Sequence, residues 1–230
     1  MSLFSRLTRR TPPPASGYES ELERYRTLPE PRLACPLNSQ RMVVVDVETS
    51  GLDPRRDRLL SIGAIVVADG LVRLEQSFEV ILRQDEASPE QNILIHGIGG
   101  SAQLTGFEPA AALLAFLMFV RKDPLVAYNA DFDRVAIRRA TSSVLGITLN
   151  NLWLDLALLA PALDTPNATS ETLDEWLSVY GIENYSRHDA LADALSTAEL
   201  LLALLGRAHA PGTCADLNRL QKDARWLQQH

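Results

Sequence analysis

The stretch MVVVDVETSGL at residues 42–52 decides the interpretation of the whole chain. It begins with a run of mostly β-branched side chains and ends in charged residues and the turn residues Ser50 and Gly51, which predicts a buried strand. Side chains two residues apart in a strand point to one face, so we expect Asp46 and Glu48 to project together at the end of that strand.

This pair of carboxylates suggests a cation. Two carboxylates that lie close together repel each other unless something cationic lies between them, and a hard divalent cation with oxygen ligands meets that need. An ordinary acidic strand end has the same pattern, so Asp-x-Glu alone leaves both interpretations open. Burial favours the metal site, because carboxylates without partners are costly in a strand that otherwise consists largely of valines.

Further strands and helices follow this first strand. Two strand-like runs at 59–68 and 71–82 are joined by Asp69-Gly70, a strong hairpin signal. Short strands are predicted at 125–128 and 152–156. Helices are predicted at residues 110–120, 132–145, 171–180 and 190–205. Three strands in a meander, followed by alternating helices and strands, predict a mixed α/β sheet with helices on its faces.

The segments outside residues 41–206 are interpreted as extensions of one domain. Residues 1–40 are rich in proline, which prevents a long helix, although residues 18–28 could form a short one. The first ten residues form a small basic amphipathic stretch, for which a frayed tail is the simpler interpretation. In residues 207–230, apolar side chains at helical spacing predict a docking helix.

The net charge of −7 is unevenly distributed along the 230 residues. Residues 1–40 and 207–230 each carry +2, and the middle of the chain carries −11. A protein that bound nucleic acid by phosphate neutralisation alone would be basic. An acidic middle is compatible with an enzyme that recruits divalent cations to handle phosphate, and equally with an acidic surface that only confers solubility.

Several function classes are excluded by simple features. The longest apolar run, residues 110–120, is too short to span a bilayer. Cys35 and Cys214 lie far apart in the sequence, which argues against a disulfide framework or a thiolate metal site and suits a reducing compartment. The N-terminus lacks the apolar core of a secretory signal, so we expect a cytoplasmic protein.

A second candidate cluster is YNADFD at residues 128–133. Here a predicted strand ends and a helix begins, the place where α/β folds usually put functional groups. Asp131 fits the N-cap of the helix as well as a catalytic role. Asp133 would lie in the first helical turn, where a favourable interaction with the helix dipole is the alternative to metal binding.

The third candidate cluster is YSRHDALAD at residues 185–193. His188 and Asp193 can converge if the histidine lies on the loop entering a helix and the aspartate one turn inside it. A histidine on such a loop can accept a proton from a metal-bound water. Tyr185 and Asp189, four residues apart, form a competing pair with the tyrosine orienting the water.

Together these clusters resemble the DnaQ-like 3′–5′ exonucleases of the DEDD superfamily, which include the proofreading ε subunit of bacterial DNA polymerase III. DVETSGL at 46–52 resembles the family's Asp-x-Glu-Thr-(Thr/Ser)-Gly-Leu, and NADFD at 129–133 resembles its Asn-x-x-Phe-Asp. His188 with Asp193 resembles the His-x(4)-Asp of the histidine branch, and IHGI at 95–98 resembles a His-Gly-Ile segment of the family. The resemblance covers about residues 41–206, and the helix continuing through Asp193 favours the histidine branch over the tyrosine branch.

The resemblance implies a ribonuclease H-like fold, a mixed five-stranded sheet flanked by helices, and a two-metal mechanism. Asp46 would bridge two Mg²⁺ ions, for which Mn²⁺ would substitute. Glu48 and Asp193 would bind the metal on the nucleophile side, and Asp133, rather than Asp131, would support the other. The residues in catalytic roles would be His188, as the base that deprotonates water, with Asp46, Glu48, Asp133 and Asp193.

The same resemblance assigns residues that contact the substrate. Thr49 and Leu52 would hold and wedge the terminal nucleotide, and Asn129 and His96 would line the groove. Arginines follow the first motif and lie on the helix of the second, where phosphate contact and ordinary surface charge are equally good interpretations. They are Arg55, Arg56, Arg58, Arg134, Arg138 and Arg139.

The implied substrate is the 3′ end of a nucleic acid, from which nucleoside 5′-monophosphates are released. The resemblance favours single-stranded DNA, in replication proofreading or repair, with a DNA polymerase or a sliding clamp as a possible partner and no membrane. An RNA-trimming exoribonuclease of the same superfamily shares the motifs and stays an alternative. A non-catalytic exonuclease-fold binding module is the alternative from another class, which the complete set of ligands disfavours.

Overall fold

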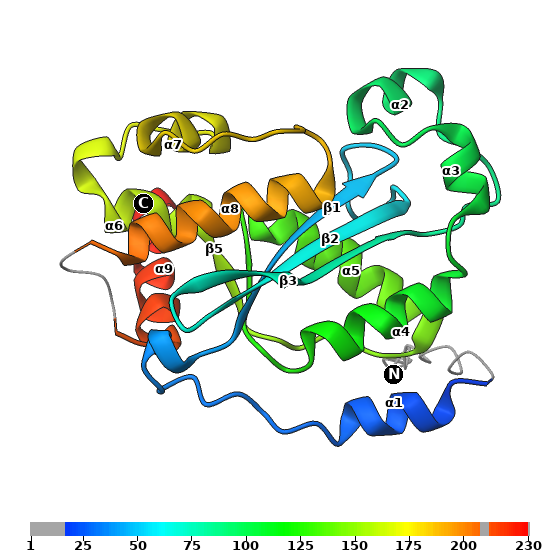
Figure 1. The fold of residues 1–230 in the computed structure, drawn as a ribbon, viewed down its shortest axis with the longest axis horizontal. Helices are drawn as coiled ribbons and strands as arrows, with labels where there is room; N and C mark the ends of the chain where they lie inside the picture. Colours follow the sequence, from blue (N-terminus) through cyan, green and yellow to red (C-terminus); the bar gives the residue numbers. More distant parts are fainter. Residues whose placement is uncertain (1–16, 208–211, 230) are drawn as a thin grey trace, which may run out of the picture.

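A five-stranded sheet in the order β3-β2-β1-β4-β5 forms the centre of the structure, a computed structural model that describes residues 17–207 and 212–229 (Figure 1). The basic stretch predicted at the N-terminus lies outside the described residues. The strands are β1 (Met42–Thr49), β2 (Leu59–Ala68), β3 (Leu71–Ile81), β4 (Leu125–Ala127) and β5 (Trp153–Asp155). All five lie within two residues of the predicted bounds.

The sheet is mixed, as predicted. β1 and β2 pair antiparallel, β2 and β3 form a hairpin, and β4 and β5 run parallel to β1. The predicted hairpin turn at Asp69-Gly70 is confirmed, since both residues have positive φ, 54° and 71°. β1 lies in the middle of the sheet, so its side chains are covered on both faces, which explains its nearly continuous apolar sequence.

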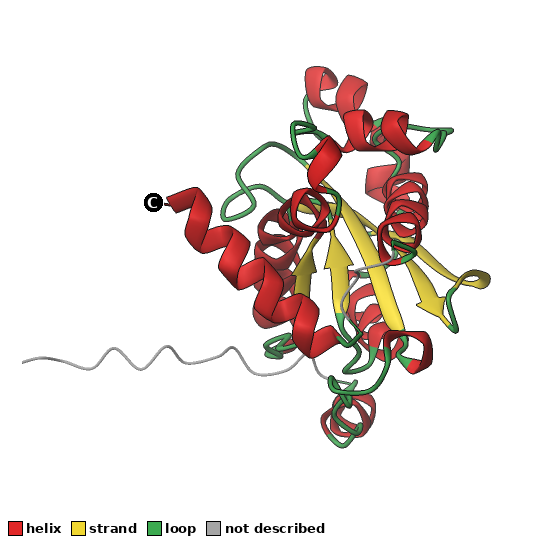
Figure 2. Ribbon diagram, turned by 90° about the vertical axis from the view of Figure 1, so that its left-hand side faces the viewer, coloured by secondary structure: helices red, strands yellow, loops and turns green. Residues whose placement is uncertain are grey.

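Helices cover both faces of the sheet (Figure 2). They are α1 (Glu19–Arg26), α2 (Glu90–His96), α3 (Gly100–Thr105), α4 (Pro109–Val120), α5 (Ala130–Leu145), α6 (Leu156–Leu163), α7 (Leu173–Tyr180), α8 (Ala190–Leu205) and α9 (Cys214–Gln229), with short 3₁₀ turns at Leu37–Ser39 and Thr165–Asn167. The helices predicted in the domain are confirmed. The sequence did not predict α2, α3 and α6, because each is short and α6 follows β5 directly and contains Pro161.

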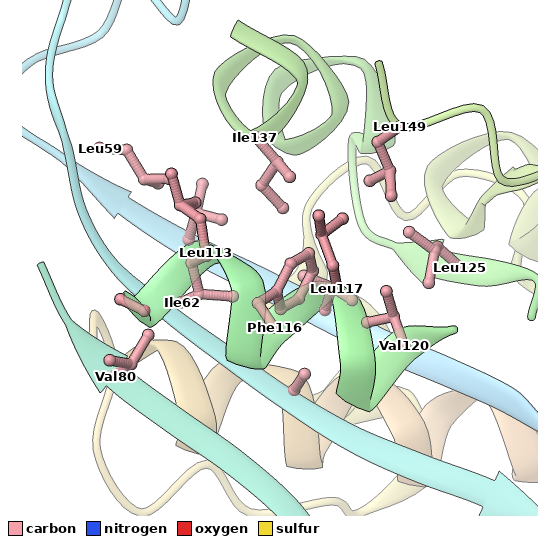
Figure 3. Packing of buried hydrophobic residues seen from close by; sticks show 14 of the residues in the cluster. Leu59, Ile62, Val80, Leu113, Phe116, Leu117, Val120, Leu125, Ile137 and Leu149 are labelled. Carbon is pink, nitrogen blue, oxygen red and sulfur yellow. The ribbon is translucent and has the colours of Figure 1, made fainter. Parts of the chain in front are cut away.

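Two apolar cores hold the layers together. Val43 and Val45 of β1 contribute to the core under α4 and α5, whereas Met42 and Val44 contribute to the core under α6 and α8. Figure 3 shows the first core, where Phe116 of α4 and its neighbours pack over β1, β2 and β4. Full burial of one such side chain contributes roughly 1.5–3 kcal/mol.

The predicted helices outside residues 41–206 are also confirmed. α1 buries Leu22 and Tyr25 in the core under α4, and the Lys122 ammonium lies 3.9 Å from the centre of the Tyr25 ring. α9 buries Cys214 and Leu217 in the other core. Both cysteines are free thiols. Within the described part of the chain, no helix is long and apolar enough to cross a membrane.

The start of α8 lies unusually close to β2, at Gly63. A Cβ atom on Gly63 would come within 2.2 Å of the backbone carbon of Ala190. Gly63→Ala should therefore push α8 away from the sheet and lower the free energy of unfolding by about 1–3 kcal/mol. Thermal unfolding followed by circular dichroism measures this loss.

Gly206→Ala is the matched control, because a Cβ there meets only ordinary contacts, at 3.4 Å or more. Its melting temperature should stay close to that of the wild type. Equal stability of the two variants would show that α8 does not depend on the missing side chain of Gly63.

Candidate active site

The first two carboxylates lie at the carboxyl end of β1. Asp46 is opposite Gly63 of β2, and Glu48 is opposite Ser61. Because they are two residues apart, both side chains point to the face of β1 that packs against α8. The absence of a side chain at Gly63 allows α8 to approach Asp46 closely.

These carboxylates are difficult to ionise in the metal-free protein. Burial raises the pKa of Asp46 well above its ordinary value, and Asp133, Asp193 and Glu48 raise it further. Burial, followed by the charge of Asp193, raises the pKa of Glu48 to about 8. Asp46 as a whole is partly exposed to solvent, but its carboxylate is enclosed by protein atoms. Burial is therefore the largest cause of the raised pKa of Asp46.

Asp133 reaches the same place from α5. Its side chain is buried, and the backbone N–H of Val47 on β1 donates a hydrogen bond to its carboxylate. Burial raises the pKa of Asp133 well above its ordinary value. α5 begins after Asn129, which has the left-handed conformation with φ 61°, and Asp133 lies in its first turn, as predicted.

Asp193 comes from the first turn of α8 and is 3% exposed. Three groups donate hydrogen bonds to its carboxylate: Asn184 Nδ2 at 2.5 Å, Arg187 Nη1 at 2.5 Å and the backbone N–H of His188 at 3.1 Å. Arg187 also pairs with Asp174 at 2.9 Å. The Arg187 guanidinium therefore offsets part of the negative charge of the site in the metal-free protein.

His188 lies on the loop that enters α8, is exposed, and has φ 64°. One ligand atom each of Glu48, His188 and Asp193 lies within 4.8 Å of the others. The structure thus brings the predicted histidine and two predicted carboxylates together. The left-handed backbone at His188 turns the loop so that its N–H points back to Asp193.

The competing pair is arranged differently. Tyr185 is 84% exposed, and the Asp189 carboxylate caps α8 by accepting a hydrogen bond from the Ala192 N–H at 2.9 Å. Asp189 still raises the pKa of Glu48, so it lies near the site. In the tyrosine arrangement Asp189 would be a metal ligand. Because its carboxylate is already used to cap α8, the structure favours the histidine arrangement, in which Asp193 is the ligand.

Two of the residues expected to contact substrate lie at the end of β1 and in the turn after it. Thr49 is buried, and its hydroxyl donates a hydrogen bond to the Gly51 carbonyl at 2.6 Å, which shapes the turn. Leu52, at the end of this turn, is 89% exposed. An exposed leucine on a turn that is held by the Thr49 hydrogen bond suits contact with a flat, partly apolar ligand such as a nucleobase.

The other two come from α2 and the β4–α5 turn. His96 is buried; its Nδ1 accepts a hydrogen bond from the Ile98 N–H at 3.1 Å, while its Nε2 has no hydrogen-bond partner among the described residues. Burial lowers the pKa of His96. Asn92 of the same helix donates a hydrogen bond to the Ser50 carbonyl, so α2 is anchored beside the turn that carries Leu52. Asn129 is exposed.

The six arginines for which the sequence left phosphate contact and surface charge equally open differ in their contacts. Arg58 donates to the Glu86 carbonyl at 2.7 Å, Arg139 donates to the Asp57 carbonyl, and Arg134 pairs with Asp131 at 2.8 Å. These three have structural partners within the protein. The other three, Arg55, Arg56 and Arg138, are exposed, and Arg56 pairs with Asp53 at 3.6 Å.

The structure corrects the interpretation of Asp131 and adds residues that the sequence did not indicate. Asp131 is not the N-cap of α5, because the helix begins at Ala130; it lies in the first turn and pairs with Arg134. Asn184 and Arg187, which hold Asp193, had no signal in their spacing. Asp155, whose carboxylate accepts a hydrogen bond from the Asn129 N–H at 3.1 Å, was predicted only as part of a strand.

The donor set fits a hard divalent cation. Four carboxylates from β1, α5 and α8 converge where burial raises the pKa of Asp46, Glu48 and Asp133, so a cation would relieve an existing electrostatic cost. Oxygen ligands of this kind suit Mg²⁺ and Mn²⁺, and thiolates are absent from the cluster.

The raised pKa of Glu48 predicts a pH-dependent stability in EDTA. The carboxyl ionises near 4.5 when free and at about 8 in the folded protein, so its stabilising contribution is complete below 4.5 and is lost as the pH rises towards 8. Glu48→Gln, which cannot ionise, should raise the free energy of unfolding at pH 8 by on the order of 1–3 kcal/mol. Chemical denaturation at pH 4.5 and pH 8 measures the difference.

The control is Glu75→Gln, which changes an exposed carboxylate on β3. It should leave stability nearly unchanged at both pH values. A Glu48→Gln variant that is less stable than the wild type at pH 8 would contradict the prediction.

Comparison with known proteins supports the resemblance to exonucleases that the sequence motifs indicate. A family described as "Exonuclease" matches residues 43–201. A DNA polymerase III subunit epsilon-like protein of Rhodobacter capsulatus is 31% identical over 84% of this chain. A PolC-type DNA polymerase III of Thermotoga petrophila is 29% identical over 70% of it. The chain spans 28% of the first relative and 11% of the second.

Among solved structures, an Escherichia coli ExoI–single-stranded DNA complex in its zinc-bound form has a similar fold. The TM-score is 0.63 at 23% identity, over 74% of this chain and 41% of that one. This likeness confirms the expected fold, a mixed five-stranded sheet flanked by helices of the ribonuclease H-like kind.

Proposed function

Because the chain belongs to the exonuclease family, we propose that it is a metal-dependent 3′–5′ exonuclease that hydrolyses the terminal phosphodiester bond of a nucleic acid. The observation that carries the proposal is the convergence of Glu48, His188 and Asp193 within 4.8 Å, next to the half-buried Asp46 and the buried Asp133. The products are a nucleoside 5′-monophosphate and a strand that is one nucleotide shorter with a free 3′ hydroxyl.

The proposed metal ligands are Asp46, Glu48, Asp133 and Asp193, with Mg²⁺ as the ion and Mn²⁺ as a substitute. When bound, the divalent cations supply a nucleophilic water at neutral pH and stabilise the charge that develops on the leaving 3′ oxygen. The chain itself provides the geometry: β1 presents two carboxylates on one face, and α5 and α8 each bring one more from their first turn.

We propose that His188 is the general base. Its neutral imidazole accepts the proton that the attacking water loses, and its position on an exposed loop leaves room for the strand to enter. The hydrogen bond from the backbone N–H of His188 to the Asp193 carboxylate holds this loop next to the carboxylates of the site. The role requires the imidazole, so it depends on this one side chain.

The proposed substrate is the 3′ end of single-stranded DNA, with a role in replication proofreading or repair. The exposed Leu52 would wedge the terminal nucleotide, Thr49 would hold it, and His96 and Asn129 would line the groove. The relatives named for DNA polymerase III and the ExoI structure with single-stranded DNA support this choice of substrate. Association with a DNA polymerase or a sliding clamp is a further part of the proposal.

A matched pair of 5′-labelled DNA and RNA oligonucleotides tests the substrate. We expect a descending ladder from the DNA strand with Mg²⁺ or Mn²⁺, a weaker one from RNA, and none in EDTA. Asp46→Asn, which removes one ligand charge without changing the shape of the side chain, should lower the rate on the order of 10³-fold. Gel electrophoresis of timed samples measures the rates.

Two outcomes would contradict the proposal. Cleavage of a closed circular single strand would indicate an endonuclease, and faster degradation of RNA would indicate an RNA-trimming enzyme. A strand with a 3′ phosphate should resist degradation, because the added group crowds the site of the terminal nucleotide.

The role of His188 is tested by comparing it with Tyr185. His188→Ala should lower single-turnover rates on the order of 10²-fold or more at saturating Mg²⁺, and Tyr185→Phe should have little effect. The tyrosine arrangement predicts the opposite result: Tyr185→Phe would lower the rate more than His188→Ala, and Asp193→Ala would have little effect on it.

A further inference from the structure

The C-terminal helix α9 lies outside the residues that match the family, yet it binds the edge of the sheet next to the site (Figures 1 and 2). Gln221 of α9 accepts a hydrogen bond from the Asp155 N–H at 2.8 Å and donates one to the Trp153 carbonyl at 2.9 Å. β5 is an edge strand, so these backbone groups have no further strand to pair with. The Gln221 amide takes the place of that strand.

Asp155 connects Gln221 of α9 to the residues at the start of α5. Its carboxylate accepts hydrogen bonds from the Asn129 N–H and the Ala157 N–H, both at 3.1 Å, and the backbone of Ala130 also donates to it. The residue is 7% exposed. One buried carboxylate therefore caps α6 and binds the turn where α5 begins.

That turn requires external support. Asn129 has φ 61°, a conformation that side chains other than glycine rarely adopt, and such residues persist when their surroundings hold them. Asp133 lies four residues further on, about one helical turn, so the direction of its carboxylate follows the start of α5. A second contact links α9 to the first turn of α5, since Arg225 pairs with Asp131 at 3.5 Å.

We propose that Asp155 and Gln221 are positioning residues for the metal ligand Asp133, so that α9 is part of the catalytic unit. This inference rests on the proposed function. Neither residue is assigned a contact with substrate or metal. Gln221 holds the end of β5, Asp155 holds the Asn129 turn from there, and the turn orients Asp133.

Asp155 contributes through its acceptor oxygen in this scheme, and its negative charge is not needed. Asp155→Asn keeps a carbonyl oxygen in the same place, whereas Asp155→Ala removes it. Removal of a residue that orients a metal ligand typically lowers metal affinity or activity by 10–100-fold. We therefore expect Asp155→Ala to weaken Mn²⁺ binding by about tenfold or more and Asp155→Asn to bind nearly as the wild type does.

Gln221→Met tests the link to α9, because methionine has a similar length and volume but does not form the two amide hydrogen bonds. Lys222→Met is the matched control, an exposed neighbour on the same helix. Variants of the 230-residue chain are compared by Mn²⁺ titration calorimetry and by hydrogen exchange of residues 129–134, and turnover is measured on labelled DNA. Gln221→Met should weaken Mn²⁺ binding, speed exchange in this segment and lower kcat with little change in KM, whereas Lys222→Met should do none of these.

The results separate this inference from the proposed function. Gln221→Met with wild-type Mn²⁺ affinity and exchange would overturn the link to α9, and Asp155→Asn as damaging as Asp155→Ala would overturn the acceptor role. If Asp155→Ala does not fold, the comparison of Gln221→Met with Lys222→Met decides. A wild-type chain that binds Mn²⁺ but degrades no nucleic acid would overturn the proposed function alone, and one that binds no Mn²⁺ would overturn both.

Discussion

Repulsion among carboxylates at the end of β1 is the constraint on which the rest of the site depends. Asp46, Glu48, Asp133 and Asp193 are brought together, and burial together with the neighbouring negative charges raises the pKa of Asp46, Glu48 and Asp133. Without a cation such a cluster lowers the free energy of unfolding. Burial of the two apolar cores stabilises the fold enough to offset this loss. The protein thus carries a cluster of carboxylates whose repulsion Arg187 offsets only in part.

The backbone makes this cluster possible by two unusual conformations and one missing side chain. Asn129 and His188 both have positive φ; Asn129 stands directly before α5, which carries Asp133, and His188 stands two residues before α8, which carries Asp193. Gly63 lets α8 approach β2 to a distance that no side chain would allow. Strained turns at the start of two helices are found where function requires an exact direction of a side chain.

Local patterns predicted most of the fold and the candidate site. The β-branched run before Asp46 predicted the central strand, and Asp69-Gly70 predicted the hairpin, because both depend on neighbouring residues. The short helices α2 and α6 escaped prediction, since one has seven residues and the other contains Pro161. Asp131 is not the N-cap that the sequence allowed, because α5 begins at Ala130, directly after Asn129, and this places Asp131 in the first turn.

The sequence by itself determined which residue types stand at which spacing: two carboxylates on one face of a strand, an aspartate in the first turn of a helix, and a histidine before another. Only the tertiary structure decided that these residues meet, that Arg187 pairs with Asp193, and that Gln221 binds the backbone of Asp155 from 66 residues away. The reason is physical. Periodicity and turn chemistry act between near neighbours in the chain, whereas charge clustering and the pairing of an edge strand depend on how distant elements pack.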